Sequence, residues 1–359
     1  MSAPVELEVG DRTVRISNPD RVYFPARGET KLDLARYYLS VADGVVRALR
    51  ARPCMLHRFP TGVTGEKVHQ KRLPRGAPDW VPTVRVHFPR WNRYADELCV
   101  AHPADVIWAV QMSTVEFHPW NSRAPEVEKP DEWRIDLDPM PMATYADVRR
   151  VAHIAHEVLD ELGAVGWPKT SGGSGMHVYV RIEPRWGFSD VRRVAHVARE
   201  VLHELGAVGW PKTSGGKGMH VYVRIAQHWG WADVRRAAHA FAREVQRRSA
   251  GLVDLTWWRK DRDPGSIFVD WNQNTRDHTI RCAYSVRGVA EALVSAPIRW
   301  DEVDDADPGD FTIATMPKRF AELGDLHAGI DDAVYRLDEL LEWADRDATD
   351  DGEALPELD

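Results

Sequence analysis

The chain has 359 residues, of which 43% are hydrophobic and 28% charged, and its formal net charge is −8. These values are typical of a soluble globular protein with one large domain or two small ones. The negative charge excludes a protein that binds nucleic acid through overall positive charge, so any such contact needs a local basic face.

The sequence also indicates a cytoplasmic protein. No apolar run approaches membrane-spanning length, and the N-terminus lacks a signal-peptide pattern. The three cysteines are widely spaced without a C-x-x-C pair, which is typical of a reducing compartment rather than of a disulfide framework or a zinc site.

The first 125 residues predict short strands and one clear helix. Alternating apolar residues on both sides of Gly10-Asp11 indicate a hairpin. Thr30 is the expected N-cap of a helix, with Asp33 three residues later. Residues 55–86 read as strands and loops with a basic cluster that is either a solvated face or a groove shaped by interleaved prolines and aromatic residues. We expect His118 to lie in a loop before the next strand.

The segment Trp133–Pro139 predicts a short buried strand that ends at Pro139. Side chains two residues apart on a strand share a face, so Asp136 and Asp138 should point the same way, about 7 Å apart. Two carboxylates this close repel each other unless a cation lies between them, and oxygen ligands suit Mg²⁺ or Mn²⁺. A structural or surface-turn role is the alternative for an isolated Asp-x-Asp.

The middle of the chain contains an internal repeat. Residues 147–189 recur as residues 190–232, a shift of 43 positions. Each copy predicts a helix followed by Trp-Pro-Lys-Thr-Ser-Gly-Gly-x-Gly-Met-His-Val-Tyr-Val, and a third helix start follows at Asp233. Two near-identical units inside a non-repetitive chain are too few for a solenoid.

Each copy carries a glycine-rich loop that ends in a histidine. Three glycines with nearby serine and lysine allow the backbone to approach an anion closely and offer hydrogen-bond donors to it. The loops are Lys169–His177 and Lys212–His220. A tight hairpin without a ligand is the alternative.

A third signal is a predicted apolar strand, residues 266–269, that ends in Asp270. This carboxylate could complete an oxygen-only site for one or two divalent ions. Just upstream, residues 257–262 combine tryptophans with Arg259 and Lys260, a composition suited to nucleic acid or, alternatively, to a core with solvated charges.

The order of these three signals resembles the archaeo-eukaryotic primase superfamily and, more closely, the polymerase domain of bacterial ligase D, an end-joining enzyme. The resemblance covers roughly residues 10–320. Further motifs that carry it are Thr30-Lys31-Leu32, Arg58-Phe59-Pro60, Gln70-Lys71-Arg72, His118-Pro119-Trp120, Asp270-Trp271-Asn272-Gln273-Asn274 and Tyr284-Ser285-Val286-Arg287. It implies an α/β (α+β) primase-polymerase fold, with a central mixed or antiparallel sheet flanked by helices. The expected domain spans residues 1–325, followed by a C-terminal helix and acidic tail over residues 326–359.

The resemblance implies template-dependent nucleotidyl transfer at DNA ends or gaps in non-homologous end joining. Asp136, Asp138 and Asp270 would hold two Mn²⁺ or Mg²⁺ ions, which activate a primer 3′-hydroxyl and stabilise the leaving pyrophosphate. One Ser-Gly-Gly loop would hold the triphosphate, with Arg287 as a further phosphate contact and His118 beside the sugar. The implied nucleotide-binding residues are Ser171, His177, Ser214, Lys217, His220, His118 and Arg287. The residues expected toward DNA are Lys31, Lys71, Arg259 and Lys260.

The family further implies a preference for ribonucleotides and cooperation with Ku and a separate DNA ligase. Because the sequence contains no ligase or nuclease region, we expect a stand-alone polymerase module in the cytoplasm, associated with the nucleoid and not with a membrane. The family pattern has one Ser-Gly-Gly loop where this chain has two. We favour the second, since Lys217 offers a cation where the first has Ser174. The alternative function is a DNA-end-binding module that the duplication has made catalytically impaired. A metal-dependent nuclease is a third, weaker option, because it explains the carboxylates but leaves the glycine-rich loop without a purpose.

Overall fold

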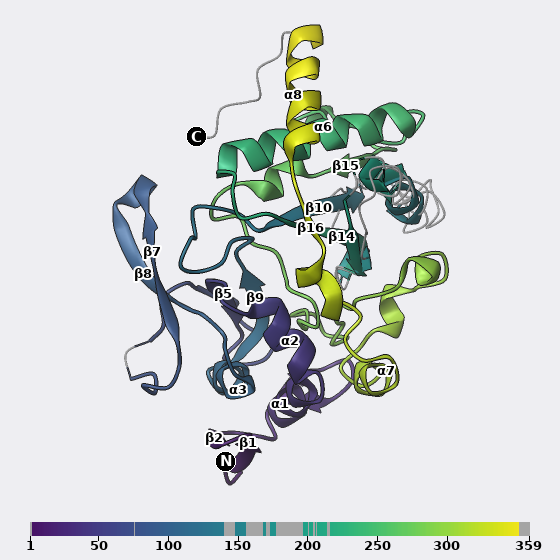
Figure 1. The fold of residues 1–359 in the computed structure, drawn as a ribbon. Helices are drawn as coiled ribbons and strands as arrows, with labels where there is room; N and C mark the ends of the chain where they lie inside the picture. The colour runs from purple at the N-terminus through teal and green to yellow at the C-terminus, as the bar shows by residue number, and fades with distance from the viewer. Residues whose placement is uncertain are drawn as a thin grey trace.

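The structure is a computed structural model, and it describes residues 2–74, 76–139, 148–155, 168–169, 173–176, 197–199, 201–203, 205, 207–213 and 216–351. Two main sheets form its centre, with helices packed around them (Figure 1). The larger sheet lies next to α6 (Trp231–Arg248), against which α8 (Asp338–Asp351) packs. The smaller sheet lies next to α1 (Lys31–Ser40), α2 (Ala42–Leu49) and α3 (Pro103–Gln111). The predicted combination of helices with a mixed, largely antiparallel sheet is confirmed.

The larger sheet is built around strand β10. Its strands are β10 (Glu132–Pro139), β11 (Pro168–Lys169), β12 (Gly173–Met176), β13 (Gly209–Thr213), β14 (Gly216–Ile225), β15 (Ile267–Val269) and β16 (Val334–Tyr335). β10 is antiparallel to β14 on one edge and to β15 on the other. Trp133 of β10 packs edge-on against Phe241 of helix α6 (Trp231–Arg248), with ring centroids 4.6 Å apart. Because side chains alternate along a strand, Asp136 projects to the face opposite α6.

Corresponding segments of the two repeat copies are registered with the same residues of β14. In the second copy, β13 pairs with β14 over five residues, from Gly209 opposite Val223 to Thr213 opposite Met219. In the first copy, β11 pairs over two residues, opposite Val221 and His220. Since β10 takes the other edge of β14, the two copies share a single edge of this strand.

The smaller sheet carries His118. Its strands are β5 (Cys54–Arg58), β6 (Val68–Gln70), β7 (Thr83–Phe88), β8 (Arg93–Leu98) and β9 (Thr114–Pro119). The expectation that His118 lies in a loop is wrong, because it lies on β9 opposite Met55 of β5. All six residues of β9 are buried, although β5 is the only strand that pairs with it in the described part of the chain.

The N-terminal region agrees with the sequence prediction. β1 (Val5–Val9) and β2 (Arg12–Ile16) form the hairpin, and β3 (Val22–Phe24) and β4 (Glu29–Thr30) follow. Thr30 caps α1 (Lys31–Ser40): its hydroxyl accepts the Asp33 N–H at 3.2 Å, and Asp33 accepts the Thr30 N–H at 2.9 Å. Helices α2 (Ala42–Leu49) and α3 (Pro103–Gln111) complete this region.

The C-terminal segment joins the larger sheet. Its helices are α7 (Met316–Leu323) and α8 (Asp338–Asp351). Short 3₁₀ turns occur here and elsewhere in the described part of the chain: η1 (Pro89–Trp91), η2 (Arg259–Asp261), η3 (Trp271–Asn274), η4 (Trp300–Glu302), η5 (Pro308–Asp310) and η6 (Ala328–Asp332). β16 pairs in parallel with β14, so the expected amphipathic helix begins only at Asp338, and the end of the acidic tail, 352–359, lies outside the described residues. Among the helices that the structure describes, none has the length and apolar character to cross a bilayer.

Candidate active site

Two of the three predicted carboxylate residues are neighbours across strands β10 and β15. The register places Leu137 opposite Val269, and the backbone N–H of Asp270 donates to the carbonyl of Asp136 at 2.6 Å. Asp136 is fully buried. The sheet therefore brings together two acidic residues that lie 134 positions apart in the chain.

The carboxylate of Asp270 is anchored by its own loop. Oδ1 accepts the backbone N–H of Asn272 at 3.0 Å, and Oδ2 accepts a side-chain N–H of Gln273 at 3.1 Å. Burial raises the pKa of Asp270, although His278 and these hydrogen bonds act against the shift. A bound cation would relieve the cost of keeping this buried carboxylate ionised.

The third predicted carboxylate belongs to the same strand as Asp136. The backbone of Asp138 lies on β10 opposite Phe268, and its side chain lies outside what the structure describes. Carboxylates on β10 and directly after β15 form a donor set of hard oxygens, which fits Mg²⁺ or Mn²⁺ better than a soft metal ion.

His220, from the second repeat copy, lies on the other side of Asp136. The two residues are directly opposite in the antiparallel pairing of β10 with β14. His220 is fully buried, and its ring is stacked on Tyr222 with centroids 5.8 Å apart and planes at 13°. The larger sheet thus places His220 on β14 and Asp136 on β10 side by side, with Asp270 directly after β15 on the other side of Asp136.

For the other loop residues predicted from the sequence, the structure does not describe the side chains. Ser171, His177 and Ser214 lie outside the described residues. Lys217 lies on β14, and its side chain is likewise outside the described part of the chain.

His118 belongs to a hydrogen-bonded cluster on the smaller sheet. Its Nε2 lies 2.8 Å from Oε2 of Glu116, and Nδ1 of His57 lies 2.6 Å from the same oxygen. The ring of His57 lies between two others, with its centroid 3.8 Å from that of His118 and 4.3 Å from that of His69. Two neighbouring imidazoles, His57 and His118, therefore contact one carboxylate, and His69 stacks on His57.

The charges in this cluster are set by its surroundings. Burial raises the pKa of Glu116, but Arg281 and the hydrogen bonds from His118 and His57 outweigh burial and hold the pKa well below its usual value. Burial and the neighbouring His57 hold the pKa of His118 well below its usual value, although Glu116 acts in the other direction. At neutral pH Glu116 is ionised and His118 is neutral.

His57, Glu116 and His118 also offer potential metal-ligand atoms within 4.8 Å of one another. Two imidazoles on one tetrahedral ion splay apart around it, whereas the centroids of these two rings are only 3.8 Å apart. The guanidinium of Arg281, 3.2 Å from Oε2 of Glu116, would also repel a metal ion. The geometry favours a hydrogen-bonding role for this cluster over a second metal centre.

Arg281 connects the two sheets. While its guanidinium contacts Glu116, its carbonyl accepts Nζ–H of Lys212 at 2.7 Å and the hydroxyl of Tyr222 at 3.1 Å. Lys212 and Tyr222 lie on β13 and β14, so the chain that carries His220 is tied through Arg281 to the cluster that holds His118.

The sequence interpretation missed Glu116, Arg281 and His57. A signal for Glu116 existed, because a charged residue two positions before His118 on an apolar strand shares its face. Nothing in the local sequence marks Arg281, since its contacts reach residues far away in the chain.

The residues predicted to face DNA lie in different environments. Lys31 is 4% exposed, and its Nζ donates to the carbonyls of Ser17 and Gln111 and to the Gln111 side chain, at distances from 2.7 to 3.2 Å. Burial is the main reason that its pKa falls to about 8. Lys260 is exposed, whereas the side chain of Arg259 lies outside the described part of the chain. Arg287 is half-buried.

Lys71 lies beside a surface cavity of about 420 Å³ at the β7–β8 hairpin. Its Nζ is 4.2 Å from the ring centroid of Phe88 and 3.7 Å from Oδ1 of Asp277. Trp91 and Tyr94, which also line this cavity, are 57% and 49% exposed. Exposed aromatic rings next to cations are typical of surfaces that stack on nucleic-acid bases.

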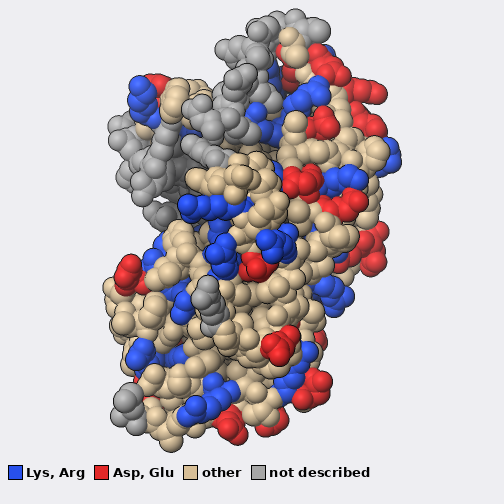
Figure 2. Space-filling view, turned by 90° about the vertical axis from the view of Figure 1, so that its left-hand side faces the viewer, with Lys and Arg blue, Asp and Glu red and all other residues tan. Residues whose placement is uncertain are grey.

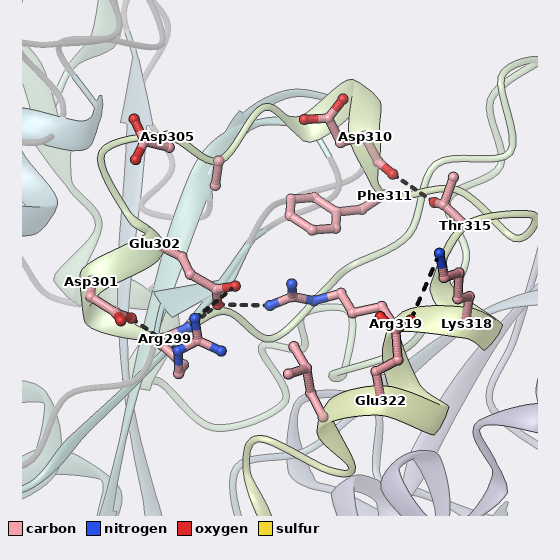
Figure 3. A pocket seen from close by; sticks show the side chains of 12 residues that line it. Arg299, Asp301, Glu302, Asp305, Asp310, Phe311, Thr315, Lys318, Arg319 and Glu322 are labelled. Atoms are coloured by element: carbon pink, nitrogen blue, oxygen red, sulfur yellow. Dashed lines mark hydrogen bonds and ion pairs between the residues drawn. The ribbon is translucent and has the colours of Figure 1, made fainter.

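Another cavity, of about 610 Å³, lies between η4 and α7 (Figure 3). Its charged side chains pair with one another: Arg319 contacts Glu302 at 2.7 Å, and Arg299 contacts Asp301 at 3.0 Å. Because opposite charges already neutralise each other across this cavity, it does not present one sign of charge to a ligand.

Comparison with known proteins identifies the family. A family model described as LigD, primase-polymerase domain, matches residues 30–187 and again residues 183–327. The chain belongs to this family. Each match contains most or all of one repeat copy, so the LigD polymerase pattern runs through the chain once, with its middle section present twice.

Curated relatives and a solved structure agree with the family. The multifunctional non-homologous end joining protein LigD of Mycolicibacterium smegmatis is 28% identical over 96% of this chain and 39% of that protein. The protein of the same name from Pseudomonas aeruginosa is 30% identical over 86% of this chain and 32% of that protein. The polymerase domain from Mycobacterium tuberculosis ligase D in complex with DNA superposes with a TM-score of 0.71 at 25% identity, covering 89% of this chain and 99% of that chain. The chain thus spans about a third to two fifths of the length of these curated relatives.

Proposed function

We propose that this chain is a template-dependent nucleotidyltransferase that adds nucleotides at DNA ends or gaps during end joining. The observation that carries the proposal is the row of Asp270, Asp136 and His220, contributed by the end of β15 and by strands β10 and β14, in a chain of the LigD polymerase family. The carboxylates can hold cations, and the histidine with its glycine-rich loop can bind phosphates, so this arrangement provides for both.

We assign Asp136, Asp138 and Asp270 as the residues that would hold Mn²⁺ or Mg²⁺. When bound, such ions neutralise phosphate charge and stabilise the leaving pyrophosphate. The chain itself would position the reactants: His220 and its loop would bind the triphosphate, and Arg287 would add a cation to the same group. Use of the second repeat copy is supported by the position of His220 opposite Asp136.

We place the DNA end along the β7–β8 side of the molecule. Figure 2 shows that Lys and Arg side chains lie across the middle of this face, whereas Asp and Glu gather along its upper right edge. Lys71 with the exposed rings of Trp91 and Tyr94 would contact the template strand there. A local basic surface is what a chain of net charge −8 needs in order to bind DNA. Ku and a separate ligase are proposed as partners in the same process.

The proposal is tested by extension of a DNA primer with a 5′-overhang or a gap opposite the template. The protein is incubated with ribonucleoside triphosphates and Mn²⁺, with Mg²⁺, or with a chelator, and its DNA affinity is measured in parallel. We expect template-directed extension that requires the metal ion. Binding to DNA ends without extension under any of these conditions would contradict the proposal and indicate an end-binding module instead.

A further inference from the structure

The carboxylate of Glu116 joins two separate parts of the proposed nucleotide site. Oε2 lies 2.8 Å from Nε2 of His118, and Oε1 accepts the backbone N–H of Gly288 at 2.8 Å. Gly288 directly follows Arg287, so one side chain contacts the histidine assigned to the sugar and the loop that carries a proposed phosphate contact.

We propose that Glu116 is a positioning residue that fixes the hydrogen-bonding direction of His118 and the place of the Arg287 loop. This inference rests on the proposed nucleotidyltransferase function. Glu116 would touch neither nucleotide nor metal ion and would act through the two groups that it holds.

The direction of the His118 hydrogen bond follows from the chemistry of the pair. An ionised carboxylate can only accept hydrogen bonds, and a neutral imidazole has one N–H and one acceptor nitrogen. Because Nε2 of His118 faces Glu116, Nε2 carries the proton and Nδ1 is left as the acceptor. Nδ1 can then receive a hydrogen bond from a sugar hydroxyl, but it cannot donate one.

The loop contact is constrained by close packing. A Cβ atom added at Gly288 would lie 2.3 Å from Cζ of Phe59, so only glycine brings its backbone N–H this close to Glu116 without displacing that ring. Arg281 contacts Oε2 of Glu116 at 3.2 Å from the same connecting segment. The segment 281–288 is thereby held at two points by one carboxylate.

His57 supports the arrangement from the neighbouring strand. It lies directly opposite Glu116 in the pairing of β5 with β9, and its Nδ1 is 2.6 Å from Oε2. Its ring centroid is 3.8 Å from that of His118, with the two planes tilted by 32°, and this close packing leaves His118 little freedom to rotate away from the carboxylate.

Glu116→Gln tests the proposal, because the amide keeps the shape and removes one acceptor. With its oxygen on the Gly288 N–H, its NH₂ group faces His118, His57 and Arg281, and Arg281 loses its acceptor. An NH₂ group only donates, so Nε2 of His118 must become the acceptor and Nδ1 must carry the proton. Nitrogen-15 NMR of the histidine side chains distinguishes these two tautomers, with the His118 signal assigned by its absence in His118→Asn.

We expect the Nε2–H tautomer in the wild type and the Nδ1–H tautomer in Glu116→Gln. In primer extension, a sugar hydroxyl would then have to accept from Nδ1–H instead of donating to Nδ1, and the preference for ribo- over deoxyribonucleotides in kcat/KM should change by up to about tenfold, the value of one hydrogen bond. The matched control is Glu97→Gln, because Glu97 is a buried carboxyl group on β8 of the same sheet. It should change neither the His118 tautomer nor the sugar preference.

Two results would overturn the inference. One is a wild-type His118 that carries its proton on Nδ1, which can be observed even if Glu116→Gln does not fold. The other is an active Glu116→Gln protein with unchanged tautomer and unchanged sugar discrimination. Absence of nucleotidyl transfer by the wild type would instead count against the proposed function, and the tautomer measurement distinguishes the two failures because it needs no turnover.

Discussion

Asp136 and His220 face each other across the antiparallel pairing of β10 and β14. Side chains at directly opposite positions have their Cβ atoms about 5 Å apart, so this carboxylate and this imidazole share one patch of the sheet. The contact joins the strand expected to hold metal ions to the strand that follows the second glycine-rich loop. It is therefore the relationship that connects the two halves of the proposed chemistry.

The first prediction concerns the two loop histidines. His220→Gln should reduce the rate of primer extension about 100-fold, because His220 lies beside Asp136. This is the upper end of the loss expected when a group that orients an active site is removed. His177→Gln, the equivalent change in the first copy, is the matched control and should retain most activity. Loss of activity only with His177→Gln would reverse the assignment of the loop copies.

The second prediction concerns the duplication. Removal of residues 147–189 leaves one complete repeat unit, and so does removal of residues 190–232. The protein without residues 147–189 keeps β13 and β14, and β13 already pairs with the edge of β14 that β11 also takes. The protein without residues 190–232 loses β13 and β14 and must form both strands from the near-identical sequence of the first copy. We expect both shortened proteins to fold with a melting temperature no lower than that of the full chain. Calorimetry checks this expectation, and failure of both proteins to fold would contradict the shared edge.

The two shortened proteins also test Lys217. The protein that lacks residues 147–189 retains Lys217, whereas the protein that lacks residues 190–232 has Ser174 at the equivalent position. We expect a lower KM for the nucleoside triphosphate in the first protein, and Lys217→Ser introduced into it should remove the difference. Equal KM values before that substitution would show that the lysine does not contact the triphosphate.

The third prediction concerns the DNA surface. Lys71→Ala should weaken binding to all overhang sequences equally and reduce the slope of log affinity against log salt by about 1, as expected for one lost phosphate contact. Lys31→Ala should instead lower the stability of the fold, because Lys31 is buried between Ser17 and Gln111. Fluorescence anisotropy at several salt concentrations distinguishes the two. A salt slope that is unchanged in Lys71→Ala would exclude the contact.

The fourth prediction concerns acid stability and the buried carboxylate of Glu132. Its oxygens contact Arg134 at 2.7 Å, Arg224 at 2.9 Å and Arg52 at 3.4 Å. Burial raises the pKa of Glu132, but the three arginines outweigh burial and lower it far below the ordinary value of 4.5. Because the folded-state pKa is lowered, this stabilisation is complete above the unfolded-state pKa and is lost as the pH falls below it.

Glu132→Gln should therefore lower the free energy of unfolding at pH 7 by about 3–5 kcal/mol, the cost of leaving buried charges without a partner. Urea unfolding at pH 7 and at pH values below 4.5 should show the difference from the wild type shrinking in acid. Asp301→Asn, which breaks an exposed ion pair with Arg299, should leave the free energy of unfolding nearly unchanged both at pH 7 and in acid. A difference that stays constant with pH would contradict the assignment to Glu132.

Local pattern was sufficient to predict the elements that carry the site. The alternation around Asp136, the apolar strand before Asp270 and the Thr30 cap each depend on a few adjacent residues, and the structure has β10, β15 and α1 at these places. The order of the motifs along the chain was enough to predict the family and the mixed sheet.

Contacts between distant segments could not be predicted in this way. The burial of Lys31 depends on acceptors from β2 and α3, and the role of Arg281 depends on strands from both sheets. His118 was expected in a loop before the strand of Asp136, yet pairing with β5 extends β9 as far as Pro119. In each case the position is fixed by tertiary partners that no local sequence pattern reveals.

The most direct test of the proposed function is the rate of primer extension by Asp136→Asn with Mn²⁺ and ribonucleotides, measured beside the wild type and Asp301→Asn. The substitution keeps the size of a buried side chain and removes one charge from the proposed metal site. We predict a loss of at least about 100-fold in rate with unchanged affinity for DNA ends, while Asp301→Asn matches the wild type. Extension by Asp136→Asn at the wild-type rate would contradict the assignment of this sheet as the catalytic centre.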